Sequence, residues 1–168
     1  MSYFYTKTIP ISTAALVANT ATQVASTTET DTNIFNGEAL QQIASSIGYP
    51  TITSAASVIT LEAGWKYFLD VRLKCVTVNL TADNRLRYVL TDTSNNIISS
   101  EGLMTLWRSG STSLSQEKCC VYIDATSASQ TFKMRFNKIA ASGTVTLNAQ
   151  DGSLGTTFKS YILIKAWR

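Results

Sequence analysis

The side chains able to do chemistry in this chain are carboxylates, thiols, amines and hydroxyls, because the sequence contains no histidine. Without an imidazole, the chain cannot build a Ser-His-Asp or Cys-His nucleophile or a histidine-based zinc site. The carboxylates from the middle of the chain onward are scattered, and no spacing sets two of them at the separation that a glycosidase needs; they are Asp70, Asp83, Asp92, Glu101, Glu117, Asp124 and Asp151. We therefore predict no catalytic residues and no enzymatic activity.

The thiols also fail to form a recognisable site. The chain has three cysteines, Cys75, Cys119 and Cys120. No fourth soft ligand accompanies them, so metal binding is not predicted. Neighbouring residues on a strand point to opposite faces, so Cys119 and Cys120 should have different environments. We expect buried or half-buried reduced thiols, with no metal and no cofactor.

Three aspartates stand beside Asn, Thr or Gly in turn-like contexts, namely Asp83, Asp92 and Asp151. Short acidic side chains at such positions usually accept hydrogen bonds from the backbone of the turn. A calcium site made of loop oxygens is the alternative, although no EF-hand spacing is present.

Basic residues are spread along the expected strands rather than gathered in one run: Lys66, Arg72, Lys74, Arg85, Arg87, Lys133, Arg135 and Lys138. They predict a solvated sheet face, or salt bridges between subunits to Asp70, Glu62 or Asp124. The net charge of +3 is too small for an electrostatic nucleic-acid binder. No apolar run approaches the roughly 20 residues that span a bilayer, so neither nucleic acid nor a membrane is an expected partner.

Residues 51–168 read as strands throughout. Apolar side chains recur at every second position over residues 65–73, 86–90, 119–123 and 132–136, which is the period of a strand with one buried face. Turn signals separate these short runs, as in an all-β sandwich. The last segment, 158–167, is apolar on both faces and should be a central strand. The expected fold is therefore an all-β antiparallel sandwich.

Residues 1–50 are expected to form an extended N-terminal arm and one short helix. The start Tyr3-Phe4-Tyr5 is aromatic and is predicted to dock on a partner protein. Over 36–48, an Asn36 cap, a terminal Gly48 and apolar side chains at helical spacing predict a helix; its apolar face consists of Leu40, Ile43 and Ile47. That helix either packs on the β domain or binds a partner.

Aromatic and aliphatic residues of the head suggest two further surfaces. Trp107 lies between two strands, where it packs in the core or an interface, or stacks on a carbohydrate. The last strand is apolar on both faces, so both faces need to be buried, and a single sandwich buries them only in part. We therefore predict a homotrimer whose axis is lined by Tyr67, Tyr122, Tyr161 and Leu163.

Three segments of the head resemble those of tumour necrosis factor-like and complement-head-like jelly rolls. They are Ile59-Thr-Leu-Glu-Ala-Gly-Trp-Lys-Tyr-Phe-Leu-Asp-Val-Arg-Leu, Leu86-Arg-Tyr-Val-Leu-Thr-Asp, and the ending Phe158-Lys-Ser-Tyr-Ile-Leu-Ile-Lys-Ala-Trp. The resemblance covers residues 52–168 and implies an antiparallel jelly roll with the last strand in the middle of its inner sheet.

Domains of this kind occur as trimeric heads, fibres and decoration proteins of bacteriophage and other virions. The resemblance thus implies a structural protein of the virion, a capsid decoration or head-fibre protein anchored to a capsid or other virion protein by its N-terminal arm. The alternative is a receptor-binding or lectin-like tip that recognises a host surface glycan. A fold by itself does not decide between these functions.

Overall fold

A computed structural model describes residues 9–19, 21–37, 39–43, 45–78, 84–106, 112–114, 119–139, 143–147 and 159–168. In these ranges the chain forms strands and no helix, which confirms the predicted all-β class. The strands are β1 (Ser12–Val17), β2 (Gln23–Val24), β3 (Thr30–Asp31), β4 (Ala39–Ile43), β5 (Ile52–Ala55), β6 (Val58–Leu61), β7 (Trp65–Arg72), β8 (Lys74–Val78), β9 (Asn84–Thr91), β10 (Gly102–Leu106), β11 (Thr112–Leu114), β12 (Cys119–Ala125), β13 (Gln130–Lys138), β14 (Thr144–Leu147) and β15 (Tyr161–Trp167).

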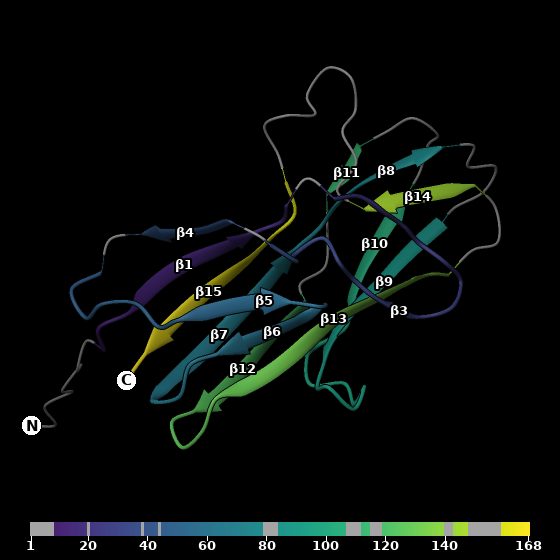
Figure 1. Cartoon of the computed structure of the whole chain (residues 1–168). Coiled ribbons are helices and arrows are strands. Elements are labelled where there is room, and N and C mark those ends of the chain that lie inside the picture. The colour runs from purple at the N-terminus through teal and green to yellow at the C-terminus, as the bar shows by residue number, and fades with distance from the viewer. Residues whose placement is uncertain are drawn as a thin grey trace, which may run out of the picture.

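The strands build three antiparallel sheets (Figure 1). The five-stranded sheet has the order β12-β7-β15-β1-β4, and the six-stranded sheet has the order β10-β9-β13-β6-β5 with β3 also paired to β13. A four-stranded sheet, β11-β8-β14-β2, continues from the end of β7. No helix in the described ranges is long and apolar enough to cross a membrane.

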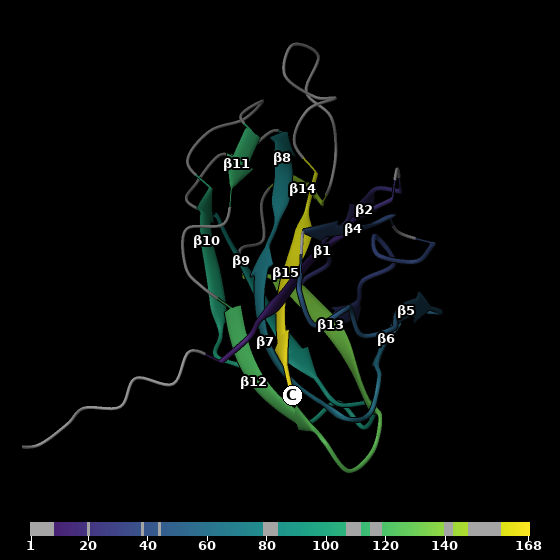
Figure 2. The ribbon, with the colours of Figure 1, turned by 90° about the vertical axis from the view of Figure 1, so that its left-hand side faces the viewer.

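Strand β15 lies in the middle of the five-stranded sheet, as the sequence predicts (Figure 2). Its residues pair with β1 on one edge, where Leu163 is opposite Ala15, and with β7 on the other, where Leu163 is opposite Asp70. The first and last described strands are therefore neighbours, and the sheet cannot be completed without both ends of the chain.

The core lies between the five-stranded and six-stranded sheets. From β7, every second side chain, including Tyr67 and Leu69, is buried in one cluster with Phe132 and Phe136 of β13. The period-two pattern predicted for β7 and β13 is thus confirmed, whereas in β9 it holds for Leu86 and Tyr88 but not for Val89, which is buried beside Leu90. Burial of each such side chain contributes roughly 1.5–3 kcal/mol to folding.

The helix predicted over 36–48 is wrong. Residues 39–43 form strand β4, whose backbone pairs with β1 from Thr13 to Val17. Ala, Leu and Gln favour helices in isolation, but β4 covers an edge of β1 that would otherwise be left unpaired, and tertiary context overrides such weak preferences. The expected cap residue Asn36 instead accepts a hydrogen bond from the backbone N–H of Ser57 through its Oδ1, at 2.7 Å. Ser57 lies in the β5–β6 turn with a φ of 67°.

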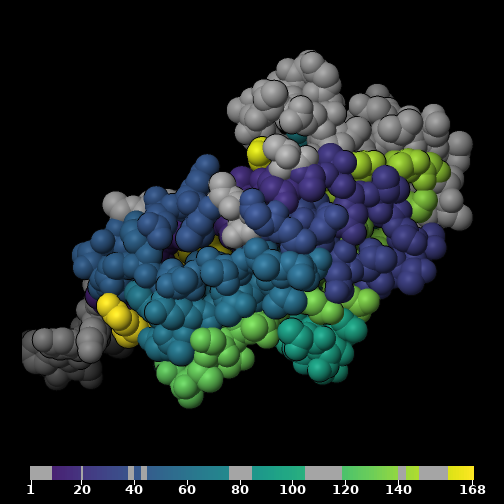
Figure 3. All heavy atoms as spheres, viewed as in Figure 1, coloured from purple at the N-terminus to yellow at the C-terminus, as the bar shows by residue number. Residues whose placement is uncertain are grey.

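We predicted that residues 1–50 form an arm and a helix apart from a head that starts at residue 51. This division is also wrong for the described part of 1–50. Strand β1 lies inside the five-stranded sheet, and Leu16, Ile34 and Phe35 are buried in the common core. In the space-filling view, the purple and blue atoms of the early chain lie directly against the atoms of the later strands (Figure 3). Residues 1–8 lie outside the described ranges.

Three of the eight basic residues predicted to lie on a wet sheet face, Arg87, Lys133 and Arg135, form an ion-pair network on the six-stranded sheet. Glu29 accepts from Arg87 Nη1 at 2.9 Å and from Arg135 Nη1 at 2.7 Å. Asp31 accepts from Lys133 Nζ at 2.9 Å and from Arg135 Nε at 3.0 Å. Asp31 belongs to β3 and Glu29 directly precedes that strand, so the network ties the early chain to β13 and β9. Asp70, one of the acidic residues predicted for bridges between subunits, pairs with Arg72 of its own strand.

Replacing Leu16 with Ala should lower the free energy of unfolding by about 2–5 kcal/mol, because a fully buried leucine leaves a cavity in the core. Urea denaturation followed by tryptophan fluorescence measures the change. Thr13→Ala, on the half-buried outer side of the same strand, is the matched control and should cost under about 1 kcal/mol. An unchanged midpoint for Leu16→Ala would mean that β1 is a dispensable arm after all.

Candidate functional site

The outer face of the five-stranded sheet is the most apolar exposed surface in the described part of the chain. Among the described residues, eight large apolar side chains are exposed. Three of them project from this face: Phe68 (36%), Tyr122 (52%) and Tyr161 (38%). Ile11, 50% exposed, precedes β1 in the same alternation. A cluster of this kind usually marks a binding surface. We call Ile11, Phe68, Tyr122, Tyr161, Leu163 and Trp167 the outer apolar face.

The aromatic residues of this face lie on neighbouring strands. Tyr122 of β12 is opposite Phe68 of β7 in the register, and the rings of Tyr122 and Trp167 stand 5.9 Å apart at 38°. A ring pair at this distance and tilt packs favourably. The aromatics therefore form a rigid platform that extends from β12 across β7 to β15.

Charged side chains lie at both ends of the aromatic platform. Arg72 Nη2 donates to Asp70 Oδ2 at 3.0 Å on β7. At the opposite end, hydrogen bonds from the hydroxyl and backbone N–H of Thr126 lower the pKa of Asp124, helped by the positive charge of Lys66. Asp124 thus keeps its negative charge across the neutral range, and the face carries both signs of charge around an apolar centre.

Three of the four predicted interface residues lie on the outer apolar face: Tyr122, Tyr161 and Leu163. The prediction that Tyr67 lines the interface is wrong, because its side chain points into the core with no exposure and its hydroxyl donates to the Glu62 carbonyl at 2.9 Å. Burial raises the pKa of Tyr67, which stays neutral. Phe68 was missed as a member of the face, and Trp167, for which the sequence allowed either the core or the trimer axis, was not among the four predicted residues. The sequence could have identified Phe68, because it is an aromatic residue at an outward position between neighbours that the alternation marks as buried.

The other predicted partner-binding residues do not form a shared surface. Leu40 and Ile47 are half-buried and pack against the core, and a strand at 39–43 removes the helical face that was to contain Leu40, Ile43 and Ile47. Tyr3, Phe4, Tyr5 and Trp107 lie outside the described residues.

The three thiols are free, and the neighbours Cys119 and Cys120 occupy different environments as predicted, because Cys119 is buried and Cys120 is half-buried. Burial raises the pKa of Cys75 to about 12 and that of Cys119 to about 11. Cys120 is half-buried and lies opposite Asp70 on the outer side of the sheet. Adjacent cysteines thus face the core and the outer apolar face respectively.

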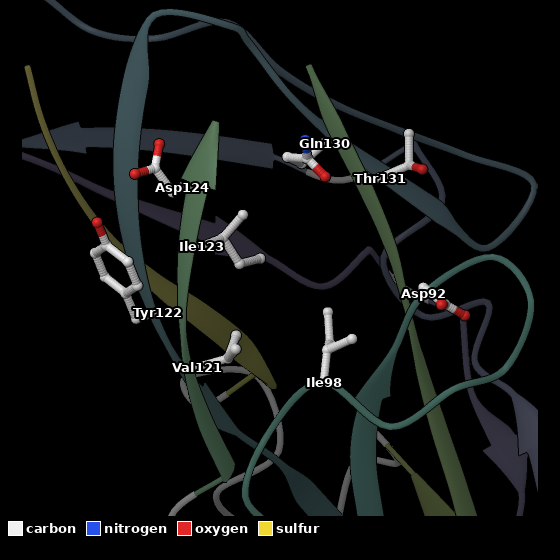
Figure 4. A pocket seen from close by; sticks show the side chains of 8 residues that line it. All are labelled: Asp92, Ile98, Val121, Tyr122, Ile123, Asp124, Gln130 and Thr131. Atoms are coloured by element: carbon white, nitrogen blue, oxygen red, sulfur yellow. The ribbon is translucent and has the colours of Figure 1, made fainter. Parts of the chain in front are cut away.

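A shallow pocket of about 250 Å³ opens beside Tyr122, where the edge strand β12 faces the loop after β9. Ile98, Val121 and Ile123 form its apolar floor, with Asp92 and Asp124 on opposite sides (Figure 4). Val121 and Ile123 were predicted to be buried and are half-buried, because β12 is the last strand of its sheet. The pocket offers apolar contact at the margin of the outer apolar face.

The carboxylate of Asp92 has the turn role predicted for it. Its Oδ1 accepts from the backbone N–H groups of Ser94 and Asn96 at 2.9 and 2.8 Å, and these turn hydrogen bonds, led by that from the Asn96 side chain, lower its pKa. Asp83 and Asp151 lie outside the described residues. Within the described ranges, no three His, Cys, Asp or Glu side chains gather as a metal centre requires.

One solved structure agrees with this arrangement of strands over nearly the whole chain. It is Eiger TNF from S. frugiperda, which superposes with a TM-score of 0.54 over 95% of this chain and 94% of that one, at 10% sequence identity. The fold is a tumour necrosis factor-like jelly roll. No family model and no curated protein matches the sequence. At this identity the likeness concerns the jelly roll and its strand order, and it leaves the function open.

In the folded jelly roll, a thiol reagent at pH 8 should label neither Cys75 nor Cys119, because both are buried and both stay protonated well above that pH. Any labelling of the native protein should fall on Cys120, and unfolding in urea should release all three thiols. Peptide mapping of the labelled chain identifies the sites. Rapid native labelling of Cys75 would show that the core between the sheets opens readily.

Proposed function

We propose that this protein is a non-enzymatic structural protein that acts as a homotrimer, with its subunits joined through the outer apolar face. We further propose that it serves in a virion as a capsid decoration or head-fibre protein. The observation that carries the first proposal is the gathering of exposed aromatic side chains on one side of the five-stranded sheet.

Contact between copies would remove that surface from water. Phe68, Tyr122 and Tyr161 are each more than a third exposed, and an aromatic side chain buried at an interface contributes strongly to association. The side chains around them are half-buried already, so association would order few additional groups. The number three comes from the resemblance of the sequence to jelly-roll heads that assemble as trimers.

The virion role is supported by the composition and by the same resemblance. About a quarter of the residues are Ser or Thr, and only 15% are charged. Such a chain presents many hydroxyl groups to water, which suits the outside of a particle. The aromatic residues Tyr3, Phe4 and Tyr5 are our candidates for contact with a capsid or other virion protein.

Replacing both Phe68 and Tyr122 with Ser should weaken self-association by about a hundredfold or more, since two exposed aromatic anchors are lost. Light scattering coupled to size-exclusion chromatography over a range of concentrations measures the mass. Val24→Ser removes an equally exposed apolar side chain from β2 of the four-stranded sheet and should leave the mass unchanged. A wild-type protein that stays monomeric at micromolar concentration would overturn the homotrimer.

A chain lacking residues 1–8 should remain folded and oligomeric, because every described strand begins after that segment, but it should no longer be incorporated into particles. Mass spectrometry of purified virions from matched infections with full-length and shortened chains measures incorporation. Absence of the full-length protein from virions would contradict the structural role. Specific binding of the full-length protein to a host glycan, with normal particles formed without it, would favour the receptor-binding alternative.

A further inference from the structure

The second half of β12 is an open edge of the five-stranded sheet. In its first half, the loop before β10 pairs with the strand, because the Ser100 N–H donates to the Cys120 carbonyl at 3.1 Å and the Cys120 N–H donates to Ser100 Oγ at 3.0 Å. Backbone groups of alternate residues point to the same edge of an antiparallel strand. Those of Tyr122 and Asp124 therefore point to the same edge as those of Cys120, and no described residue forms a hydrogen bond with them.

This open edge runs along the pocket beside Tyr122. The lining includes four consecutive residues of β12, from Val121 to Asp124, whose side chains alternate between the two faces of the sheet. The pocket therefore lies beside the edge of the strand rather than on one face. The opposite wall comes from the other sheet and the loop after β9, and consists of Asp92, Ile98, Gln130 and Thr131 (Figure 4). An open row of N–H and C=O groups next to a pocket is an arrangement that accepts an added strand.

The size and lining of the pocket fit a side chain of a peptide. Its volume is about 250 Å³, below the roughly 300–1,000 Å³ of a site for a small molecule. Its floor is apolar, and Val121 and Ile123 are only half-buried at this edge. Strand β12 also lacks the lysine or proline that commonly keeps an edge strand from pairing. An added strand would thus bury apolar surface as well as form backbone hydrogen bonds.

The charges around the pocket select the kind of strand. Its lining holds two carboxylates, Asp92 and Asp124, and no cation. Turn hydrogen bonds lower the pKa of each carboxyl, so both are negative at neutral pH. Of the cations nearby, Lys133 is bonded to Asp31 at 2.9 Å, and Lys66, opposite Asp124 in the register, forms no ion pair within the described residues. A basic side chain is therefore the complement of this lining.

We infer that the edge of β12 binds an extended segment of another protein, which pairs with the backbone of Tyr122 and Asp124 and carries a Lys or Arg side chain beside an apolar one. The apolar side chain lies on Val121 and Ile123, and the basic one lies between Asp92 and Asp124. Backbone hydrogen bonds give such a contact its affinity, and the pocket gives it selectivity. The inference goes beyond the proposed self-association, because only the ring of Tyr122 belongs to the outer apolar face and its backbone points to the edge.

A displayed library of random peptides, selected on the immobilised full chain, identifies the sequence that the edge prefers. We expect a Lys or Arg within a run of β-branched or aromatic residues. Binding of a selected synthetic peptide should slow hydrogen exchange of the Tyr122 and Asp124 amides by about tenfold or more, because both become hydrogen-bonded. Selection of no peptide, or of acidic peptides, would overturn the inference.

Two substitutions at one position separate the backbone from the side chain. Tyr122→Pro removes the N–H at the edge and should weaken peptide binding, measured by fluorescence anisotropy, by about tenfold or more. Tyr122→Thr removes the ring but keeps the N–H, and should change binding less than about threefold. Equal binding by the two variants would show that the peptide does not pair with this edge. Circular dichroism establishes that both are folded, and hydrogen exchange of the wild type decides if the proline variant is not.

The charge of the occupant is tested with Asp124→Asn, which keeps an acceptor for Thr126. This change should weaken binding of the basic peptide by about threefold, whereas a peptide with methionine in place of its basic residue should bind both forms equally. An equal loss for the two peptides would overturn the basic occupant.

The oligomer mass separates this inference from the proposed function. A monomeric wild type that still binds the selected peptides would overturn the self-association alone. If no peptide is selected and Tyr122→Pro lowers the oligomer mass, a second copy covers the edge and the inference is wrong.

Discussion

The C-terminal strand β15 has hydrogen-bonded neighbours on both edges, β1 from the start of the described chain and β7 from its middle. This pairing joins residues 12–17 to residues 161–166, so nearly the whole chain must be ordered before the five-stranded sheet is complete. Closing so long a loop costs entropy, and the contacts of β15 must offset this cost. The burial of Ile162 and Ile164 against the six-stranded sheet is what makes that closure favourable.

A central strand of this kind also determines the other side of the sheet. With both edges paired and Ile162 and Ile164 directed inward, the alternate residues Tyr161, Leu163 and Trp167 must project outward. β7 and β12 add Phe68 and Tyr122 in the same direction. The outer apolar face is therefore a direct consequence of sequences that are apolar at consecutive positions.

The sequence was informative where periodicity was strong. Alternation over β7, β9 and β13 predicted the class and the inward residues, and the apolar residues on both faces of β15 predicted its central position. It failed for Ala39–Ile43, whose residues favour a helix, because the unpaired edge of β1 is a feature of the assembled sheet that no local pattern contains. It also failed to find Glu29 and Asp31 as partners of Arg135, since more than a hundred residues separate them. Tyr67 was assigned to the interface although its own alternation with Trp65 and Leu69 placed it in the core.

The two outer faces of the sandwich differ in a way that bears on assembly. On the six-stranded sheet, Arg87, Lys133 and Arg135 are paired with acidic residues of the same chain. On the five-stranded sheet, aromatic rings are exposed. A face whose charged groups are paired within the chain gains little from a partner, whereas a face with exposed rings gains from their burial. This asymmetry is the reason why our proposal of self-association places the contact on the five-stranded sheet.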